Sequence, residues 1–364
     1  MKKFKIFTQN IAEKNIAQLA RMLLLAAIMA MLAILILYFA GRFNNQRLTA
    51  QQFINLQEGD NPHAGFRRAH AKGICVYGNF ESNGNLASHS TAAIFGKGVT
   101  PFLGRFSIAG NNPTAPDLKA PVRSLAFALN SETDQEWRVA MNTPPVMAVA
   151  TPEAFFEQLQ ALSTDPVTKK RDPEKIKAFF AAHPESEAFN EWKASYVPTN
   201  SFATEHYHSI NAFYLIDKFG NKQAVRWVAV PQTMEESVPM LYSESADALQ
   251  VQLSKLLEKN VIKFNMVFTL AGDGDDENNP TKPWPSQREK INAGTLNIIN
   301  WEAQETGKCA QKNFDPLVLP EGIAATADPI LRARGAAYAE SYRRRAKEIL
   351  LGIEETTTSS GSLL

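Results

Sequence analysis

A long uncharged stretch near the N-terminus limits how this chain can fold more than any other feature. The run Met22–Ala40 ("MLLLAAIMAMLAILILYFA") contains no charged residue. As an α-helix it would be roughly 28 Å long, which is about the thickness of the hydrocarbon core of a bilayer. The run therefore predicts a transmembrane helix over 22–40.

Basic residues ahead of this run predict its orientation. They are Lys2, Lys3, Lys5, Lys14 and Arg21. Positive charge is retained on the cytoplasmic side, so residues 1–21 are expected in the cytoplasm and the remainder outside it. A cleaved signal peptide is the alternative, but such peptides have a shorter apolar region and end at a small-x-small site, unlike Tyr38-Phe39-Ala40. We expect a retained single-pass anchor in the inner (plasma) membrane, with the main domain in the periplasm or another extracytoplasmic space.

The composition of the chain argues against a nucleic-acid partner. Its 364 residues include 38 Lys+Arg and 37 Asp+Glu, for a net charge of +1. There is no basic excess of the kind that phosphate backbones attract. The 22 Phe and 20 Pro residues indicate a large core with many irregular connections. The length suits one large domain or two ordinary ones.

The two cysteines, Cys75 and Cys309, lie far apart and have no metal-binding spacing. A disulfide between them would require an oxidising, extracytoplasmic compartment. Cys75 stands in an apolar run, and cysteine is among the residues most often buried as a free thiol. The sequence alone favours a buried free thiol.

Beyond the anchor, the sequence divides into three parts. Residues 41–59 are polar and rich in Gln and Asn, which predicts a linker. Residues 60–350 have the apolar content of a folded domain. Residues 351–364, which end in "EETTTSSGSLL", are small and polar, which predicts a disordered tail.

The domain alternates short β-rich runs with turn clusters. Strands are expected at 73–81, 91–95, 104–109, 124–129, 137–141, 212–216, 224–230, 260–270 and 295–299. Helical patterns occur at 151–163, 173–182, 246–259 and 328–350. Gly220-Asn221 is typical of a hairpin turn. This order predicts an α+β fold, with an antiparallel sheet or barrel and appended helices, and not a parallel βαβ sheet.

The last predicted helix places a tyrosine beside arginines. Arg334 and Tyr338 are four residues apart and share a helix face, and Arg345 returns to the same stripe. A phenol has a pKa of about 10, yet a tyrosine bound to ferric iron must be ionised. A neighbouring guanidinium favours that ionised form. The alternative for this segment by itself is an amphipathic basic helix in which Tyr338 only packs.

Several short motifs give this segment a context. They are "RRAHAKG" (67–73), "RFSIAG" (105–110), "NTPP" (142–145), "NPTKPWP" (279–285), "NFDPLVLPEGI" (313–323) and "DPILRARGAAY" (328–338). With these motifs in the family's order, the chain from about Asn61 to Lys347 resembles the haem catalases. It is most similar to the short catalase-related peroxidases, which consist of a single core domain. The resemblance implies an eight-stranded antiparallel barrel with appended helices, and haem, of type b, as cofactor.

The resemblance assigns catalytic roles to three residues on one side of the haem. His70 would be the distal acid–base residue, and Ser107 would hydrogen-bond a ring nitrogen of His70. Asn142 would hold the peroxide from the other side. An imidazole has a pKa near neutrality, which suits a group that accepts and returns a proton of hydrogen peroxide.

The resemblance also assigns the haem-binding residues. Tyr338 would be the iron ligand, with Arg334 beside it and Asp328 holding that arginine. Haem propionates would be neutralised by Arg67, Arg105 and Arg345, and Phe155 would contact the haem.

The expected activity is reduction of hydrogen peroxide, and of organic peroxides, with an organic or membrane-derived donor. Ala69 before the distal histidine and the less aromatic segment from Val146 predict a wider pocket, with weaker dismutation and stronger peroxidase activity. The anchor suggests a membrane cytochrome as partner. The alternatives are a hydroperoxide isomerase of the allene oxide synthase type and a haem-binding protein without enzyme activity. The oligomeric state stays open.

Overall fold

The computed structural model describes residues 2–39, 48–130, 135–165, 167–168, 170–234 and 245–353. Two compact units are present, residues 1–49 and residues 50–364. The first unit contains helix α1 (Lys2–Phe39). Within the described residues, Ala20–Tyr38 is long and apolar enough to cross a bilayer, with a mean hydropathy of 2.6. An apolar helical span is thus present where one was predicted and begins at Ala20, two residues earlier, whereas Ala40 lies outside the described residues. Insertion of this helix into a membrane stays a prediction.

The second unit is built on an antiparallel sheet. Its strands are β1 (Gly73–Ser82), β2 (Gly98–Ile108), β3 (Arg123–Asn130), β4 (Glu136–Asn142), β5 (Tyr207–His208), β6 (Phe213–Ile216), β7 (Lys222–Pro231), β8 (Ile262–Leu270), β9 (Lys290–Ala303) and β10 (Ile323–Ala325). The order is β10-β6-β7-β5-β4-β3-β2-β1-β9-β8. In addition to its pairing with β9, β8 pairs with β7. This last pairing closes eight of the described strands into a barrel, as predicted.

The barrel interior is filled by large apolar side chains. Successive side chains of a strand point to opposite faces, so every second residue faces inward. In β4 the inward residues are Trp137, Val139 and Met141, all nearly inaccessible to solvent. The ring of Trp137 packs edge-on against Trp227 of β7, with their centroids 5.3 Å apart. The inner face therefore supplies most of the apolar burial that stabilises the unit.

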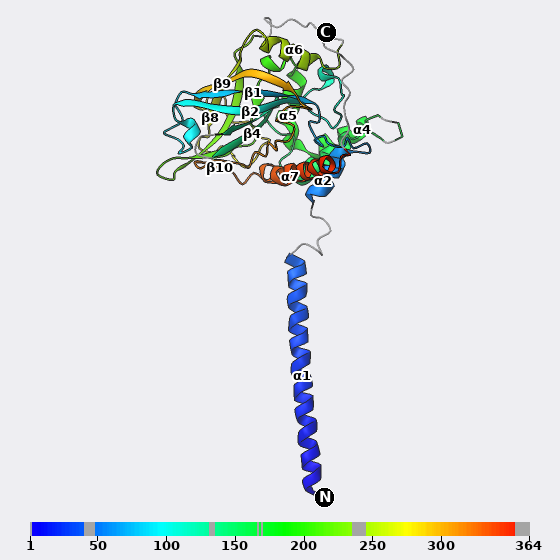
Figure 1. The fold of residues 1–364 in the computed structure, drawn as a ribbon. Coiled ribbons are helices and arrows are strands. Elements are labelled where there is room, and N and C mark those ends of the chain that lie inside the picture. Colours follow the sequence, from blue (N-terminus) through cyan, green and yellow to red (C-terminus); the bar gives the residue numbers. More distant parts are fainter. Residues whose placement is uncertain are drawn as a thin grey trace. The chain divides into compact units, whose positions relative to one another are not determined.

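The helices of the described part of this unit connect or flank the barrel strands. They are α2 (Ala50–Glu58), α3 (Pro152–Leu162), α4 (Pro173–Ala182), α5 (Glu187–Ser195), α6 (Ala248–Leu257) and α7 (Pro329–Leu350). Figure 1 shows α2 and α7 packed together along one side of the barrel unit. Asp328 caps α7, since its carboxylate accepts hydrogen bonds from the backbone N–H groups of Ile330 and Leu331.

The structure corrects several sequence expectations. The predicted linker 41–59 is wrong for Ala50–Glu58, which forms α2 and is anchored by an ion pair between Glu58 and Arg344 of α7. The expected strand at 91–95 is wrong, because Ala93–Phe95 is a short 3-10 turn. Helix α5 was missed. The tail beyond residue 353 lies outside the described residues.

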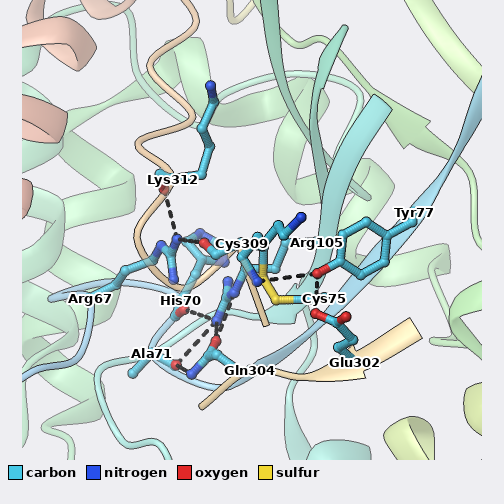
Figure 2. Close-up of a disulfide and its surroundings, with 11 residues drawn as sticks. Arg67, His70, Ala71, Cys75, Tyr77, Arg105, Glu302, Gln304, Cys309 and Lys312 are labelled. Atoms are coloured by element: carbon cyan, nitrogen blue, oxygen red, sulfur yellow. Dashed lines mark hydrogen bonds between the residues drawn. A yellow bond between two sulfur atoms is a disulfide. The ribbon is translucent and has the colours of Figure 1, made fainter. Parts of the chain in front are cut away.

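The expectation of a free thiol is also wrong. Cys75 of β1 and Cys309, in the segment after β9, form a disulfide, and both residues are fully buried. Arg67 donates hydrogen bonds to the carbonyl oxygens of Cys309 and Lys312, at 2.8 and 2.9 Å (Figure 2). The disulfide thus fixes the segment on which Arg67 rests.

Candidate functional site

The outer face of β2, β3 and β4 carries a line of polar side chains. Ser107 pairs with Ser124, and Ser124 pairs with Asn142. Directly paired residues of neighbouring strands project from the same face with Cβ atoms about 5 Å apart. These three residues are called the polar row. His208 of β5, paired with Asn142, extends it.

Two residues further along the strands, the same face carries small side chains and an arginine. Arg105 pairs with Ala126, and Ala126 pairs with Ala140. One step further, Leu103 pairs with Ala128. Methyl side chains at the centre of this face project less far from the sheet than larger residues would.

His70 reaches the polar row from a left-handed turn before β1. Its φ is 55°, a conformation that costs a non-glycine residue about 1 kcal/mol or more. The guanidinium of Arg105 holds this turn by donating to the carbonyl oxygens of His70 and Ala71, at 2.8 and 3.1 Å (Figure 2). Gly73 makes this approach possible, since a Cβ there would lie 2.6 Å from that guanidinium.

The ring of His70 contacts Ser124, not Ser107. Its Nδ1 lies 3.1 Å from the Ser124 hydroxyl oxygen, which also donates a hydrogen bond to Oδ1 of Asn142. This arrangement corrects the predicted Ser107 contact, although Ser107 is buried beside Ser124 in the polar row. Sequence reasoning missed Ser124, and its only signal was a serine in the apolar run "RSLAFALN" that aligns with Asn142 across the sheet.

The environment of His70 keeps its ring neutral. Burial, followed by repulsion from Arg105, Arg334 and Arg67, lowers the pKa of His70 to about 4. At neutral pH the imidazole is therefore uncharged, and one of its ring nitrogens can accept a proton.

Tyr338 lies on α7 next to Arg334. The guanidinium carbon of Arg334 is 5.8 Å from the centre of the Tyr338 ring. Tyr338 packs against an apolar cluster on the outer face made of Cys75, Ala128, Cys309 and Phe314. The tyrosine and its arginine are thus adjacent, as predicted from their spacing.

A hydrogen-bonded chain fixes Arg334. Its guanidinium donates to Oδ1 of Asn211 at 2.6 Å and to the carbonyl oxygen of Ala140 at 3.2 Å. The amide of Asn211 in turn donates to the carboxylate of Asp328 at 2.7 Å. Asp328 therefore holds Arg334 through Asn211 and not directly, which corrects the expected contact. Asn211 was not identified from the sequence.

The site gathers positive charge that the described side chains leave largely uncompensated. Arg67 and Arg105 donate to carbonyl and amide oxygens, with Gln304 as the side-chain partner of Arg105. Burial, together with the charge of Arg345, lowers the pKa of Arg105 to about 9, so the guanidinium stays charged at neutral pH. Arg345 is 3% exposed, and its Nε and one terminal nitrogen have no hydrogen-bond partner. Buried donors of this kind favour an anionic ligand.

These observations fit haem. His70 contacts Ser124 on β3, while Tyr338 packs on the cluster that includes Ala128 of the same strand and the same face. Four residues of strand separate these two points by roughly 13 Å. The position between them is Ala126, which is flanked by Arg105. Haem has two carboxylates for the unpartnered guanidinium donors, and its iron accepts a phenolate ligand.

Phe155 lies in a different environment. Its ring is 5.4 Å from that of Phe53 on α2, and it packs against a cluster of Ala148, Val149, Ala154 and Phe179. The predicted contact between Phe155 and haem stays a prediction.

Comparison with known proteins agrees with this geometry. The family model for catalase matches residues 55–351. The chain belongs to the catalase family. A catalase-related peroxidase of Synechococcus elongatus is 35% identical over 326 residues, covering 89% of this chain and 95% of the relative. A catalase-related peroxidase of Mycolicibacterium paratuberculosis is 27% identical and covers 82% of this chain and 95% of the relative.

Solved structures show the same fold. Catalase A of Saccharomyces cerevisiae superposes with a TM-score of 0.69 at 19% identity, covering 86% of this chain and 65% of the yeast chain. A bacterial catalase gives a TM-score of 0.68 at 19% identity, covering 91% of this chain and 66% of that chain. The chain therefore spans about two-thirds of these larger catalases.

Membership of the family sets the general activity. This catalase-family protein is an oxidoreductase that acts on peroxide, and proteins of its family bind haem. The arrangement of His70, Asn142 and Tyr338 around one face of the barrel gives that activity a physical basis.

Proposed function

We propose that this catalase-family enzyme is a membrane-anchored peroxidase that binds haem b and reduces hydrogen peroxide with an organic or membrane-derived electron donor. One observation carries the proposal. His70, which is neutral, and Tyr338, which lies beside Arg334, both contact the outer face of β3. Ala126 lies between the two contact points, and buried guanidinium groups border them.

Each residue of the candidate site has a separate role in the proposed reaction. When bound, haem supplies redox-active iron and a conjugated ring, which give electrons to peroxide. His70 accepts a proton from one oxygen of the peroxide and returns it to the other oxygen, which already carries a hydrogen and leaves as water. The amide of Asn142 orients peroxide from the polar row. Tyr338 supplies an anionic ligand, and Arg334 beside it favours the ionised form. Arg67, Arg105 and Arg345 hold the carboxylates.

The side chains near His70 support a preference for larger donors over a second peroxide. Ala69 precedes the distal histidine, and Val146 follows the Asn142 motif. Neither side chain extends as far as an aromatic ring would, and on this basis we expect a wider approach to the polar row. A wider pocket positions a second peroxide less well and admits an organic donor more easily. We expect oxidation of phenolic donors to exceed dismutation.

The test compares haem-loaded wild type with His70→Ala. Oxygen release reports dismutation, and absorbance of an oxidised phenolic donor reports peroxidase turnover. Both rates should fall by roughly 100- to 10,000-fold in the variant, because general acid–base catalysis contributes that much. Fast dismutation by wild type without donor oxidation would contradict the preference for donors. Equal rates in both proteins would exclude His70 as the acid–base group.

The proposed location rests on three features of the chain. Ala20–Tyr38 is an apolar helix, and basic residues precede it. The Cys75–Cys309 disulfide adds independent support, since disulfides persist in oxidising compartments and are rare in the cytosol. We propose a single-pass protein of the inner (plasma) membrane with its catalytic domain in the periplasm, where a membrane cytochrome is a candidate donor.

Cell fractionation with protease treatment of spheroplasts tests this location. The domain should sediment with membranes and be degraded when protease is added outside. Alkylation of thiols after cell proteins are denatured without reductant should leave Cys75 and Cys309 unmodified, because the disulfide has no free thiol. A protease-resistant domain with alkylated cysteines would place it in the cytoplasm. A truncated chain beginning at residue 41 that kept full turnover with the physiological donor would argue against a membrane partner.

A further inference from the structure

We propose that Tyr77 is the residue that oxidises phenolic donors too large to reach the haem, with Glu302 as the acceptor of the Tyr77 phenol proton. Tyr77 passes each electron inward to the haem and recovers a hydrogen atom from the donor at the surface. The inference deepens the proposed function and rests on it, because peroxide must first oxidise the haem.

Tyr77 lies where the packed interior of the unit meets solvent. Its hydroxyl donates a hydrogen bond to the carboxylate of Glu302, near the end of β9 (Figure 2). The phenol oxygen also accepts a hydrogen bond from the backbone N–H of Lys308 at 3.1 Å. The side chain of Tyr77 is half-buried, whereas Glu302 is exposed. A donor that stays in solvent can therefore approach the phenol.

The ring of Tyr77 packs near the proposed haem site. It contacts the same apolar cluster, containing the disulfide and Ala128, on which Tyr338 packs. In the register of the sheet Tyr77 pairs with Leu103, and Leu103 pairs with Ala128. Two strand spacings put the backbone of Tyr77 about 10 Å from that of Ala128. Electrons cross packed protein over separations of this size within the time of an enzymatic turnover.

Glu302 is placed to take the proton that oxidation of Tyr77 releases. A neutral phenol loses a proton together with its electron, because a phenol cation radical is a strong acid. Burial, followed by the hydrogen bond to Glu302, raises the pKa of Tyr77, so the phenol is neutral at pH 7. The carboxylate that already accepts the hydrogen bond can take the proton without any movement of the ring. The Lys308 N–H keeps donating to the phenol oxygen throughout.

Electrons and protons balance over one peroxide. Tyr77 loses one electron to the peroxide-oxidised haem and one proton to Glu302, which releases that proton to solvent. A phenolic donor then transfers a hydrogen atom to the oxygen of Tyr77, which re-forms the phenol and leaves a donor radical. Two such cycles, with two protons taken up at the haem, convert one peroxide and two donors into two waters and two donor radicals.

A second tyrosine–carboxylate pair provides a matched control. Tyr214 of β6 is also half-buried, donates a hydrogen bond to Glu277 at 2.8 Å and has a pKa raised by burial and by that bond. It is not among the residues that pack on the cluster shared by Tyr77 and Tyr338, and β6 is several strands away from β1 in the sheet. Tyr214→Phe removes the same chemistry at a distance from the haem site.

Spin trapping with peptide mapping tests the radical site directly. The haem-loaded full-length chain in detergent is treated with peroxide and a nitrone trap without donor, and the adduct is located by mass spectrometry. Wild type and Tyr214→Phe should carry the adduct on Tyr77. Glu302→Gln keeps an acceptor oxygen but no basic carboxylate, and should greatly reduce the yield on Tyr77. An unmodified Tyr77 in peroxide-treated wild type would overturn the inference.

Two donors of different size give the functional readout. One is a small free phenol, and the other is the same phenol attached to a dextran polymer that cannot enter the protein. In Tyr77→Phe, oxidation of the polymer-linked phenol should fall to the level without enzyme, whereas oxidation of the free phenol should persist. Glu302→Gln should slow oxidation of the polymer-linked phenol by roughly 100-fold, a typical contribution of a general base. Tyr214→Phe should match wild type with both donors.

The outcomes separate this inference from the proposed function. The haem spectrum and peroxide consumption in Tyr77→Phe should match wild type, which shows that the variant folds and holds haem. If wild type oxidises neither phenol, the proposed peroxidase function fails, and the adduct map still decides whether Tyr77 is oxidised. If wild type and Tyr77→Phe oxidise the polymer-linked phenol equally fast, the peroxidase function stands and Tyr77 is not the site of donor oxidation.

Discussion

The two faces of strands β1 to β4 have opposite compositions. The inner face carries large rings, such as Trp137, Phe106 and Phe127, which interlock in the barrel core. The outer face carries alanines, serines and buried polar groups, such as Ala126, Ser124 and Arg105. Since alternate residues of one strand serve both faces, each strand provides stability on one side and chemistry on the other.

This difference explains how the fold tolerates a site with a strained turn and repelling charges. The left-handed turn at His70 and the repelling arginines are unfavourable by themselves. They persist because the inner-face core and the disulfide stabilise the strands from which they project. We therefore expect inner-face changes to affect folding and outer-face changes to affect the cofactor and proton transfer.

Removing the Cys75–Cys309 disulfide tests how much this part of the outer face contributes to stability. The link closes a loop with a sequence separation of 234 residues. In the chain-entropy model a loop of that length contributes about 5 kcal/mol, so Cys75→Ser with Cys309→Ser should lower the free energy of unfolding by up to that amount. Urea unfolding of the detergent-solubilised chain measures it. A change below about 1 kcal/mol would show that the outer-face packing holds this segment without the bond.

Truncating Trp137 tests the inner face. Its ring is 1% exposed and packs against Phe95, Phe127 and Trp227. Trp137→Ala should cost about 3 to 5 kcal/mol by leaving a cavity. In the fraction that remains folded, the haem spectrum should match wild type. An altered spectrum at full stability would contradict the division between the faces.

Filling the outer face should have the reverse effect. Ala126 lies between the His70 and Tyr338 contact points on β3. Ala126→Leu should change the free energy of unfolding by about 1 kcal/mol or less, because it faces away from the core, and should abolish haem retention. Ala140→Leu fills the paired position on β4 and should also abolish haem retention. Haem retained by both variants would show that the group binds elsewhere.

The smallest expected effect is a pH dependence of stability in the protein without haem. His70 and His208 have pKa values lowered to about 4, mainly by burial, against 6.5 for an exposed imidazole. Between these values the unfolded chain binds more protons, so stability should fall as the pH decreases from about 6.5 to about 4. His70→Gln should make that decline shallower in urea titrations. An unchanged slope would mean that His70 titrates normally.

The sequence predicted the parts of this molecule that depend on local pattern. The strands β1, β3, β4 and β7 follow from alternation, and Arg334 and Tyr338 share a face because their spacing matches the helical turn. Parts that depend on tertiary pairing were missed. Helix α2 was taken for a linker because its residues are polar, and contacts from Arg344 to Glu58 and Asn55 hold it.

The errors in the site have the same origin. Ser107 and Ser124 are paired across the sheet, so the motif that contains Ser107 marked the correct row but not the serine that touches His70. Likewise, the sequence gives no sign that Asn211 lies between Asp328 and Arg334. The Cys75–Cys309 bond requires two distant segments to meet, which a sequence separation of 234 residues conceals.

The most direct test of the account is the optical and resonance Raman spectrum of the haem-loaded full-length chain beside Tyr338→Phe. Wild type should show the charge-transfer and vibrational bands of a phenolate bound to ferric iron. The variant should lose those bands while its unfolding curve stays within about 1 kcal/mol of wild type, because Tyr338 lies outside the barrel core. A variant that keeps the wild-type spectrum would show that another residue ligates the iron.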